Sequence, residues 1–155
     1  GVILMHMQGD PQTMQLAPHY DDVIAELTTF FQERLQVIAD LGIPPNRVVL
    51  DPGIGFGKTT EHNLTILARL DQFQKLGRPV CLGVSRKGFM GRLLDRPVER
   101  REAGSLAVAA DALMRGAAQI LRVHDVAGTA DLVKVLTTLQ SRRSLAPFGQ
   151  ASGER

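Results

Sequence analysis

The sequence predicts an α/β fold in which parallel strands are covered by helices. Short, nearly continuous apolar runs alternate with longer segments whose apolar residues recur every three to four positions. Buried parallel strands have the first pattern and amphipathic helices have the second. The alternation occurs four times, which fits half of an eight-unit (β/α)8 barrel or a small, open, doubly wound sheet.

The expected elements follow one another as strand and helix along residues 1–140, which we take as one domain. The strands are expected at residues 2–7, 47–50, 80–84 and 119–123. The helices are expected at residues 21–41, 63–76, 86–94, 99–115 and 129–139. Segment 141–155 shows no periodicity and is expected to be a flexible tail.

Glycine and proline mark the ends of the expected helices. Gly42 follows the helix at 21–41, and Gly77 with Pro79 follows the helix at 63–76. Gly116 ends the alanine-rich helix at 99–115. Glycine stops a helix because it adopts the left-handed conformation without steric cost.

Composition excludes several classes of protein. The chain has 155 residues, of which 44% are hydrophobic and 22% charged, with a formal net charge of +2. No aromatic residues interleave with the basic pairs at 100–101 and 142–143, so no nucleic-acid partner is expected. No apolar span reaches 18 residues, so no membrane helix is expected. The first residues resemble no signal peptide, and a cytoplasmic location is therefore expected.

Two further expectations concern the interior of the fold. Cys81 is the single cysteine, so no internal disulfide can form, and its apolar surroundings indicate a small core residue. The sequence opens directly on an apolar strand, and we therefore expect the fold to extend before this segment.

Each expected strand brings at least one polar side chain to its carboxyl end, where such folds bind ligands. The residues at these four ends are Met5, His6 and Met7; Asp51; Ser85, Arg86 and Lys87; and Arg122, His124 and Asp125. Since residues two apart on a strand point to one side, Arg122 and His124 are expected to reach one anion together. The alternative is that one of them pairs with Asp125 at the surface.

The segment "VVLDPGIGFGKTTEHN" raises the possibility of a nucleotide-binding loop. That loop requires Gly-x-x-x-x-Gly-Lys-Ser/Thr, and Pro52 stands where the first glycine is needed. We therefore expect another site, with Asp51 at a strand end and a glycine loop of positive φ behind it. Its carboxylate could accept two N–H groups from a planar, guanidine-like edge. The alternative is an aspartate that caps a helix or a turn.

Four motifs together resemble dihydropteroate synthase, a pterin-binding enzyme of the folate pathway. They are "LMHMQGDPQTM", "LDPGIGFGKTTEHN", "GVSRKGFMGRLL" and "RVHDV", and the resemblance covers residues 1–140. It implies the second half of a (β/α)8 TIM barrel. It also implies condensation of 6-hydroxymethyl-7,8-dihydropterin pyrophosphate with p-aminobenzoate, with release of pyrophosphate, by a homodimer that uses Mg2+.

The resemblance also implies roles for the residues at the pterin. Asp51 would hold the amino and ring N–H edge, and Lys87 the carbonyl and ring-nitrogen edge. Arg122 would lie over the pterin, and Met5 would line its pocket.

A second group of roles concerns p-aminobenzoate and pyrophosphate. Phe56 would pack near the aromatic ring, with Lys87 at the border of that site. Gly88 departs from the serine that many members have near the carboxylate, which helix N–H groups could hold instead. Arg122 and His124 would bind the pyrophosphate, and with Lys87 they are the catalytic candidates because they stabilise charge on the leaving group.

The family's first half, which supplies the asparagine ligand of the metal, has no counterpart in the sequence. No metal ligand is therefore expected here, two strand edges would be unpaired, and activity is expected to need the missing half. Two alternatives are a non-catalytic pterin-binding or assembly module and a related methyltransferase that has no pyrophosphate site.

Overall fold

A computed structural model of the protein describes residues 1–144 and contains four short parallel strands. They are β1 (Val2–Met5), β2 (Val48–Asp51), β3 (Cys81–Leu82) and β4 (Ile120–Leu121). β1 pairs with β2 and β3 with β4, and a parallel bridge between Leu50 and Val80 joins the two pairs. The order β1-β2-β3-β4 confirms the expected parallel sheet and leaves β1 and β4 at its edges within the described residues.

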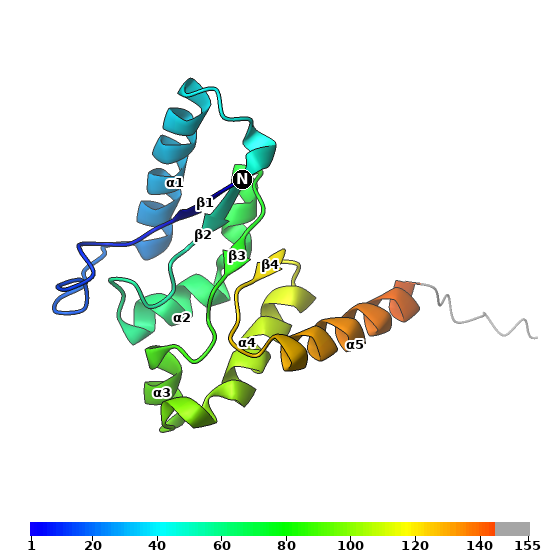
Figure 1. The fold of residues 1–155 in the computed structure, drawn as a ribbon. Coiled ribbons are helices and arrows are strands. Elements are labelled where there is room, and N and C mark those ends of the chain that lie inside the picture. Colours follow the sequence, from blue (N-terminus) through cyan, green and yellow to red (C-terminus); the bar gives the residue numbers. More distant parts are fainter. Residues whose placement is uncertain (145–155) are drawn as a thin grey trace, which may run out of the picture.

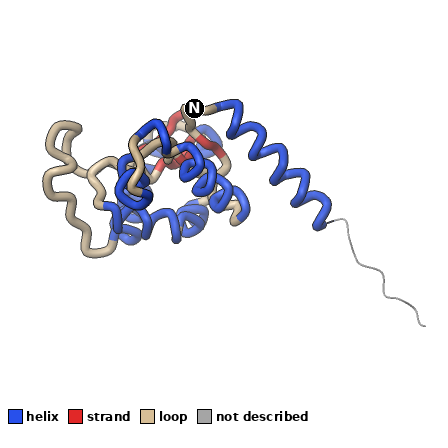
Figure 2. Tube along the Cα trace, turned by 90° about the horizontal axis from the view of Figure 1, so that it is seen from below, coloured by secondary structure: helices blue, strands red, loops and turns tan. Residues whose placement is uncertain are grey.

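Five α-helices and three short 3-10 segments connect and cover these strands (Figure 1). The helices are α1 (Val23–Asp40), α2 (Thr60–Ala68), α3 (Gly88–Leu94), α4 (Glu102–Met114) and α5 (Val126–Ser144). The 3-10 segments are η1 (Pro45–Arg47), η2 (Leu70–Leu76) and η3 (Val98–Arg100). Seen from below, the long loop before α1 projects on one side and α5 on the other (Figure 2).

The core lies between the strands and the helices. Leu27 and Phe31 on α1, Leu50 on β2, Ile66 on α2 and Phe73 on η2 are fully buried in it. Cys81 is buried in β3, as expected. Burial of such side chains stabilises the fold by about 1.5–3 kcal/mol each. The pattern of apolar residues therefore identified the face that each helix turns toward the sheet.

Helix starts differ from the expected ones, and side chains cap those of α1 and α2. α1 starts after Asp22, whose carboxylate accepts the N–H groups of Ile24 and Ala25. α2 starts three residues earlier than expected because Thr59 and His62 cap each other's backbone N–H groups. Beyond Ala68 the chain tightens into η2 and stops at Gly77, which is left-handed as expected. α3 and α4 begin two and three residues later than expected, at Gly88 and Glu102.

The strands are shorter than the apolar runs that predicted them. β1 ends at Met5 and β4 at Leu121, each two residues early, whereas β2 runs one residue further, to Asp51. α5 reaches Ser144, so the first four residues of the expected tail, 141–144, are helical. The rest of that expected tail, 145–155, lies outside the described residues.

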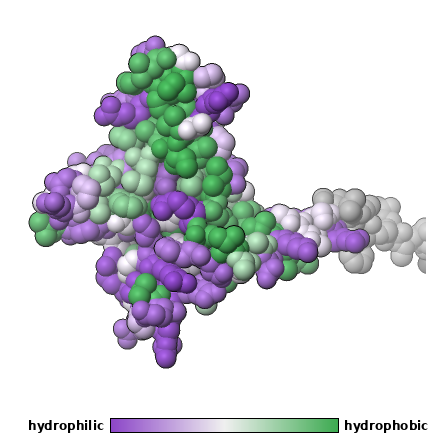
Figure 3. Space-filling view, viewed as in Figure 1, coloured by the Kyte–Doolittle hydropathy of each residue, from purple (hydrophilic) through white to green (hydrophobic). Residues whose placement is uncertain are grey.

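Both edges of the sheet carry exposed apolar side chains. Ile3 on β1 is 56% exposed and Ile120 on β4 is 40% exposed, and Val126 at the start of α5 is also exposed. In Figure 3 an apolar band runs from the top of the molecule over the strands toward β4 and the first part of α5. Within residues 1–144 no helix is long and apolar enough to span a bilayer.

Candidate active site

The loop after β2 has a backbone that requires its glycines. Gly53, Gly55 and Gly57 all have positive φ, between +63° and +81°. A Cβ atom at Gly53 would collide with the carbonyl oxygen of His6, and one at Gly57 with that of Gln8. The loop thus packs directly on the segment after β1, as a glycine loop of positive φ was expected to allow.

Asn63 on α2 ties this loop to the helix that follows. Its side-chain oxygen accepts the N–H of Gly55 at 2.8 Å, and its amide donates to the carbonyl of Thr59 at 2.6 Å. Asn63 is completely buried, so both bonds are shielded from water. The backbone N–H of Gly55 is therefore taken up internally, unlike the free N–H groups of a nucleotide-binding loop.

Asp51 lies at the base of this loop and is 3% exposed. One carboxylate oxygen accepts the N–H of Gly53 at 2.8 Å, so the turn role foreseen as the alternative is present. The other oxygen stands 3.7 Å from a terminal nitrogen of Arg122. The first oxygen fixes the carboxylate, and the second can still accept N–H groups from a ligand.

Lys87 follows β3 and faces Phe56 of the glycine loop. Its ammonium nitrogen lies 3.9 Å from the centre of the Phe56 ring, a cation–π contact. Burial, followed by the nearby charge of Arg122, lowers the pKa of Lys87, and Asp51 opposes the shift. Two predicted site residues from different strand ends are thus in direct contact.

Arg122 and His124 lie just past the end of β4, and their joint binding of one anion stays a prediction. The strand ends at Leu121, although the N–H of Arg122 still donates to the carbonyl of Leu82 at 2.9 Å. The Arg122 side chain is 55% exposed and reaches Asp51 across Gly83. His124 bonds instead to the hydroxyl of Ser85, at 3.0 Å from its Nδ1.

The remaining predicted residues lie at the same end of the sheet. Met5 is the partner of Asp51 in the parallel register of β1 and β2. Gly88 is the first residue of α3, directly after Lys87, and is exposed. Asp51 is therefore paired with Arg122 and Lys87 with Phe56, the charges of the first pair act on Lys87, and Met5 and Gly88 lie beside Asp51 and Lys87 in the chain or the sheet.

Two buried residues of the site, Lys58 and His6, were given no role in the sequence analysis. Lys58 is 1% exposed, and its ammonium nitrogen lies 3.0 Å from both His6 Nδ1 and the carbonyl oxygen of Phe56. Burial lowers the pKa of Lys58 to about 7; Asp51 opposes this shift and Lys87 adds to it. Burial and the nearby Lys58 lower the pKa of His6 to about 4. The motif showed a lysine after glycine, but no signal of its burial.

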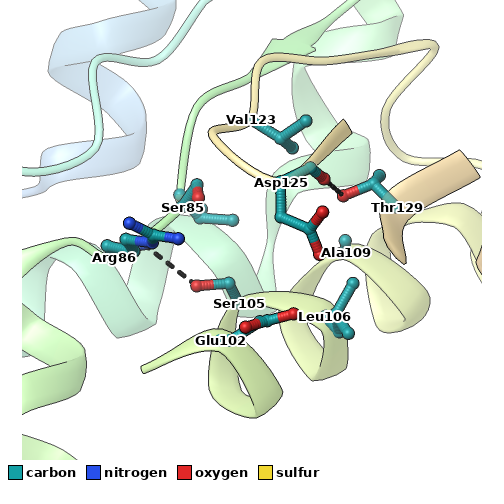
Figure 4. Close-up of a pocket in the computed structure, with 10 residues that line it drawn as sticks. Ser85, Arg86, Glu102, Ser105, Leu106, Ala109, Val123, Asp125 and Thr129 are labelled. Carbon is teal, nitrogen blue, oxygen red and sulfur yellow. Dashed lines mark hydrogen bonds between the residues drawn. The ribbon is translucent and has the colours of Figure 1, made fainter. Parts of the chain in front are cut away.

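A small junction beside His124 fixes the turn after β3 on α4 and the turn after β4 on the start of α5 (Figure 4). The backbone N–H of Arg86 donates to the hydroxyl of Ser105 at 3.0 Å, and Thr129 donates to the carbonyl of Asp125 at 2.7 Å. A bond from the N–H of Gly128 is the main reason that the pKa of Asp125 is lowered. The space enclosed is only about 10 Å3, so this junction positions the turns and is too small for a substrate.

Within residues 1–144 no three His, Cys, Asp or Glu side chains come close enough together to hold a metal ion. Asp51 is already engaged with Gly53 and faces Arg122. These side chains do not fit a resident metal.

The arrangement defines a class: parallel strands covered by helices, half of a (β/α)8 barrel, with a carboxylate and cations at the carboxyl ends of the strands. Residues 1–124 match the family described as "Pterin binding enzyme". The chain belongs to this family.

Similar proteins narrow the family further. The dihydropteroate synthase of Haemophilus influenzae is 46% identical over 134 residues, which are 86% of this chain and 48% of that protein. The dihydropteroate synthase of Escherichia coli K12 is 46% identical over 142 residues, which are 92% of this chain and 50% of that protein. The chain thus spans about half the length of the curated relatives that it matches.

Solved structures agree with the sequence comparisons. The dihydropteroate synthase of Stenotrophomonas maltophilia superposes with a TM-score of 0.86 at 46% identity, over 90% of this chain and 52% of that one. That of Xanthomonas albilineans, solved in complex with 7,8-dihydropteroate, gives 0.81 at 45% identity, over 90% and 51%. The barrel expected from the sequence is confirmed, and the chain forms about half of it.

Proposed function

We propose that this chain is the part of a dihydropteroate synthase that holds the reacting ends of both substrates. The observation that carries the proposal is that Asp51 and Arg122 form an ion pair and that the charges of both act on Lys87, although the three residues follow three different strands. The reaction would join 6-hydroxymethyl-7,8-dihydropterin pyrophosphate to p-aminobenzoate and release pyrophosphate. Relatives named dihydropteroate synthase support this reading.

The pterin would bind between Asp51 and Lys87. The second carboxylate oxygen of Asp51 would accept N–H groups from the pterin, because its first oxygen is held by Gly53. Lys87 would donate to the carbonyl and ring nitrogen at the opposite edge. Met5, next to Asp51 in the sheet, would line the pocket.

The cations would act on the leaving group. The amine nitrogen attacks the pterin methylene carbon, the bond from that carbon to the pyrophosphate oxygen breaks, and the amine loses a proton. Negative charge grows on the pyrophosphate as this happens, so Arg122, His124 and Lys87 stabilise the transition state more than the bound substrate.

p-Aminobenzoate would lie on the other side of Lys87, with its ring near Phe56 and its carboxylate toward the first turn of α3 at Gly88. Mg2+ would arrive with the pyrophosphate, since the described side chains do not supply a ligand set. A homodimer, which the resemblance implies, and a cytoplasmic location, which was expected because the first residues resemble no signal peptide, stay predictions.

The test uses a chimaera in which the part of the Escherichia coli relative that this chain does not match is joined before Gly1. Pyrophosphate release that needs both substrates is the expected result. Lys87→Ala should abolish release, while Lys75→Ala, which changes an exposed lysine on η2, should not. Turnover near normal in Lys87→Ala would contradict the proposal.

The half-length match favours one alternative, a pterin-binding module without catalysis. That module would bind a pterin in a manner lost in Asp51→Asn, yet release no pyrophosphate in any chimaera. Pyrophosphate binding that disappears in Arg122→Ala would argue against a methyltransferase, which needs no pyrophosphate site.

A further inference from the structure

A groove opens beside the candidate site, on the side of α3. It lies between residues 14–18, the glycine loop with the start of α2, and the start of α3, and it measures about 710 Å3. Met14, Leu16 and Phe89 contribute apolar surface to it. Its size is that of a pocket for a small organic ligand.

The charges around this groove all have one sign. Lys58, Lys87 and Arg92 line it, and no aspartate or glutamate does. Lys58 is bonded to His6 and the carbonyl of Phe56, and Lys87 stacks on Phe56 at one end of the groove. Of these three cations, Arg92 on α3 is the one whose charged group has neither bonds like those of Lys58 nor an aromatic ring beneath it like Lys87.

The guanidinium of Arg92 is held by one of its nitrogens only. Nε donates to the hydroxyl of Thr60 at 2.6 Å. Among the described residues Arg92 forms no ion pair, and its two terminal nitrogens have no hydrogen-bond acceptor. The terminal pair is the part of a guanidinium that binds a carboxylate through two parallel bonds.

Gly88 lies between Lys87 and Arg92 along the groove, and no side chain fills the space there. A Cβ atom built at Gly88 would stand 3.8 Å from a terminal nitrogen of Arg92. A longer side chain at this position would occupy the space in front of the guanidinium. Because Gly88 has no side chain, the guanidinium of Arg92 stays accessible from the groove.

We propose that Arg92 binds the carboxylate of the aromatic amine substrate and selects for a charged amine. This rests on the proposed function, because it assumes that the amine enters beside Phe56 and Lys87. The ring would lie on the apolar wall of the groove, and the carboxylate would reach the terminal nitrogens of Arg92. Arg92 is then a specificity-determining residue that takes no part in the bond exchange.

The first experiment measures binding of p-aminobenzoate and of neutral p-aminobenzamide to the full 155-residue chain by ligand-observed NMR. Arg92→Gln should weaken p-aminobenzoate about tenfold or more, in keeping with loss of a charge-assisted pair, and leave p-aminobenzamide unchanged. Arg92→Lys should recover part of the loss. Arg96→Gln, at an exposed arginine that does not line the groove, is the matched control and should bind like the wild type.

The second experiment repeats the comparison as kinetics in the chimaera. Arg92→Gln should raise KM for p-aminobenzoate about tenfold while kcat and the KM of the pterin substrate stay within twofold. Equal binding and equal KM in Arg92→Gln, or an equal loss for the acid and the amide, would overturn the role of Arg92. A wild-type chimaera that releases no pyrophosphate would count against the proposed function, and the binding experiment would still decide the role of Arg92.

Discussion

The loop after β2 and the segment after β4 meet across the candidate site, but they are held very differently. Asp51 is buried, bonded to Gly53, and backed by a loop that Asn63 ties to α2. Arg122 is more than half exposed and has one ion pair, at 3.7 Å. The edge that would recognise a planar heterocycle is thus preorganised, whereas the cation that would meet the leaving group is free to adjust.

The largest effect should come from breaking the preorganised loop. Gly53→Ala puts a Cβ atom into the carbonyl oxygen of His6, whereas Gly77→Ala has the same φ of +67° and no atom within 4 Å. Gly77→Ala should cost about 1–2 kcal/mol of unfolding free energy from backbone strain alone. Gly53→Ala should cost at least about 3 kcal/mol, or prevent folding, in urea denaturation followed by circular dichroism. Equal losses in the two variants would show that the close approach is unimportant.

The pH dependence of the unfolding free energy should show how firmly the glycine loop buries Lys58. Its pKa is about 7 in the folded chain against 10.5 for the ordinary side chain, so between these values the unfolded chain binds more protons. The unfolding free energy should therefore rise with pH from about 7 to 10, by up to about 1.4 kcal/mol per pH unit from this group.

The Lys58→Met variant should lose that part of the slope, which urea titrations at each pH would measure. Lys75→Met, which changes an exposed lysine, should keep the wild-type slope. If the two variants have the same slope, the ammonium of Lys58 is not the group that titrates.

Asp51→Asn should affect binding more than stability. The amide keeps an oxygen for the N–H of Gly53 but loses the charge that faces Arg122. We expect pterin affinity of the chimaera to fall about tenfold to a hundredfold, as for loss of a charge-assisted bond, when binding is followed by calorimetry. Unchanged affinity would leave Asp51 with its turn role alone.

Arg122→Ala should have the smallest effect on the fold. The pair spans 3.7 Å, its arginine is 55% exposed to water, and the Asp51 carboxylate keeps its bond to Gly53, so the unfolding free energy should change by about 1 kcal/mol or less. Pyrophosphate affinity of the chimaera should nevertheless fall about tenfold, while Arg47→Ala, at an exposed arginine of η1, should have neither effect. A large loss of stability in Arg122→Ala would mean that the segment after β4 is as firmly fixed as the loop after β2.

The same contrast explains what the sequence could predict. Asp51 and Lys87 could be predicted because neighbouring residues show where a strand ends and how the elements follow one another. The glycine loop could be predicted because glycine is the residue that adopts positive φ without strain. Lys58 was missed because its burial depends on the segment after β1, 52 positions away from it at His6. The length of β4 could not be predicted for a similar reason: β3 pairs with β4 over only two residues, and an apolar run does not reveal where its partner strand ends.

The sole cysteine has a practical consequence. Cys81 is buried in β3, between β2 and β4, and burial raises the pKa of its thiol, so a thiol reagent can reach it only when the strands separate. The rate at which the reagent labels Cys81 therefore reports how often the sheet opens. Adding the other half of the barrel should lower this labelling rate if the two halves unfold as one cooperative unit. The rate should stay unchanged if the halves are in contact but unfold independently.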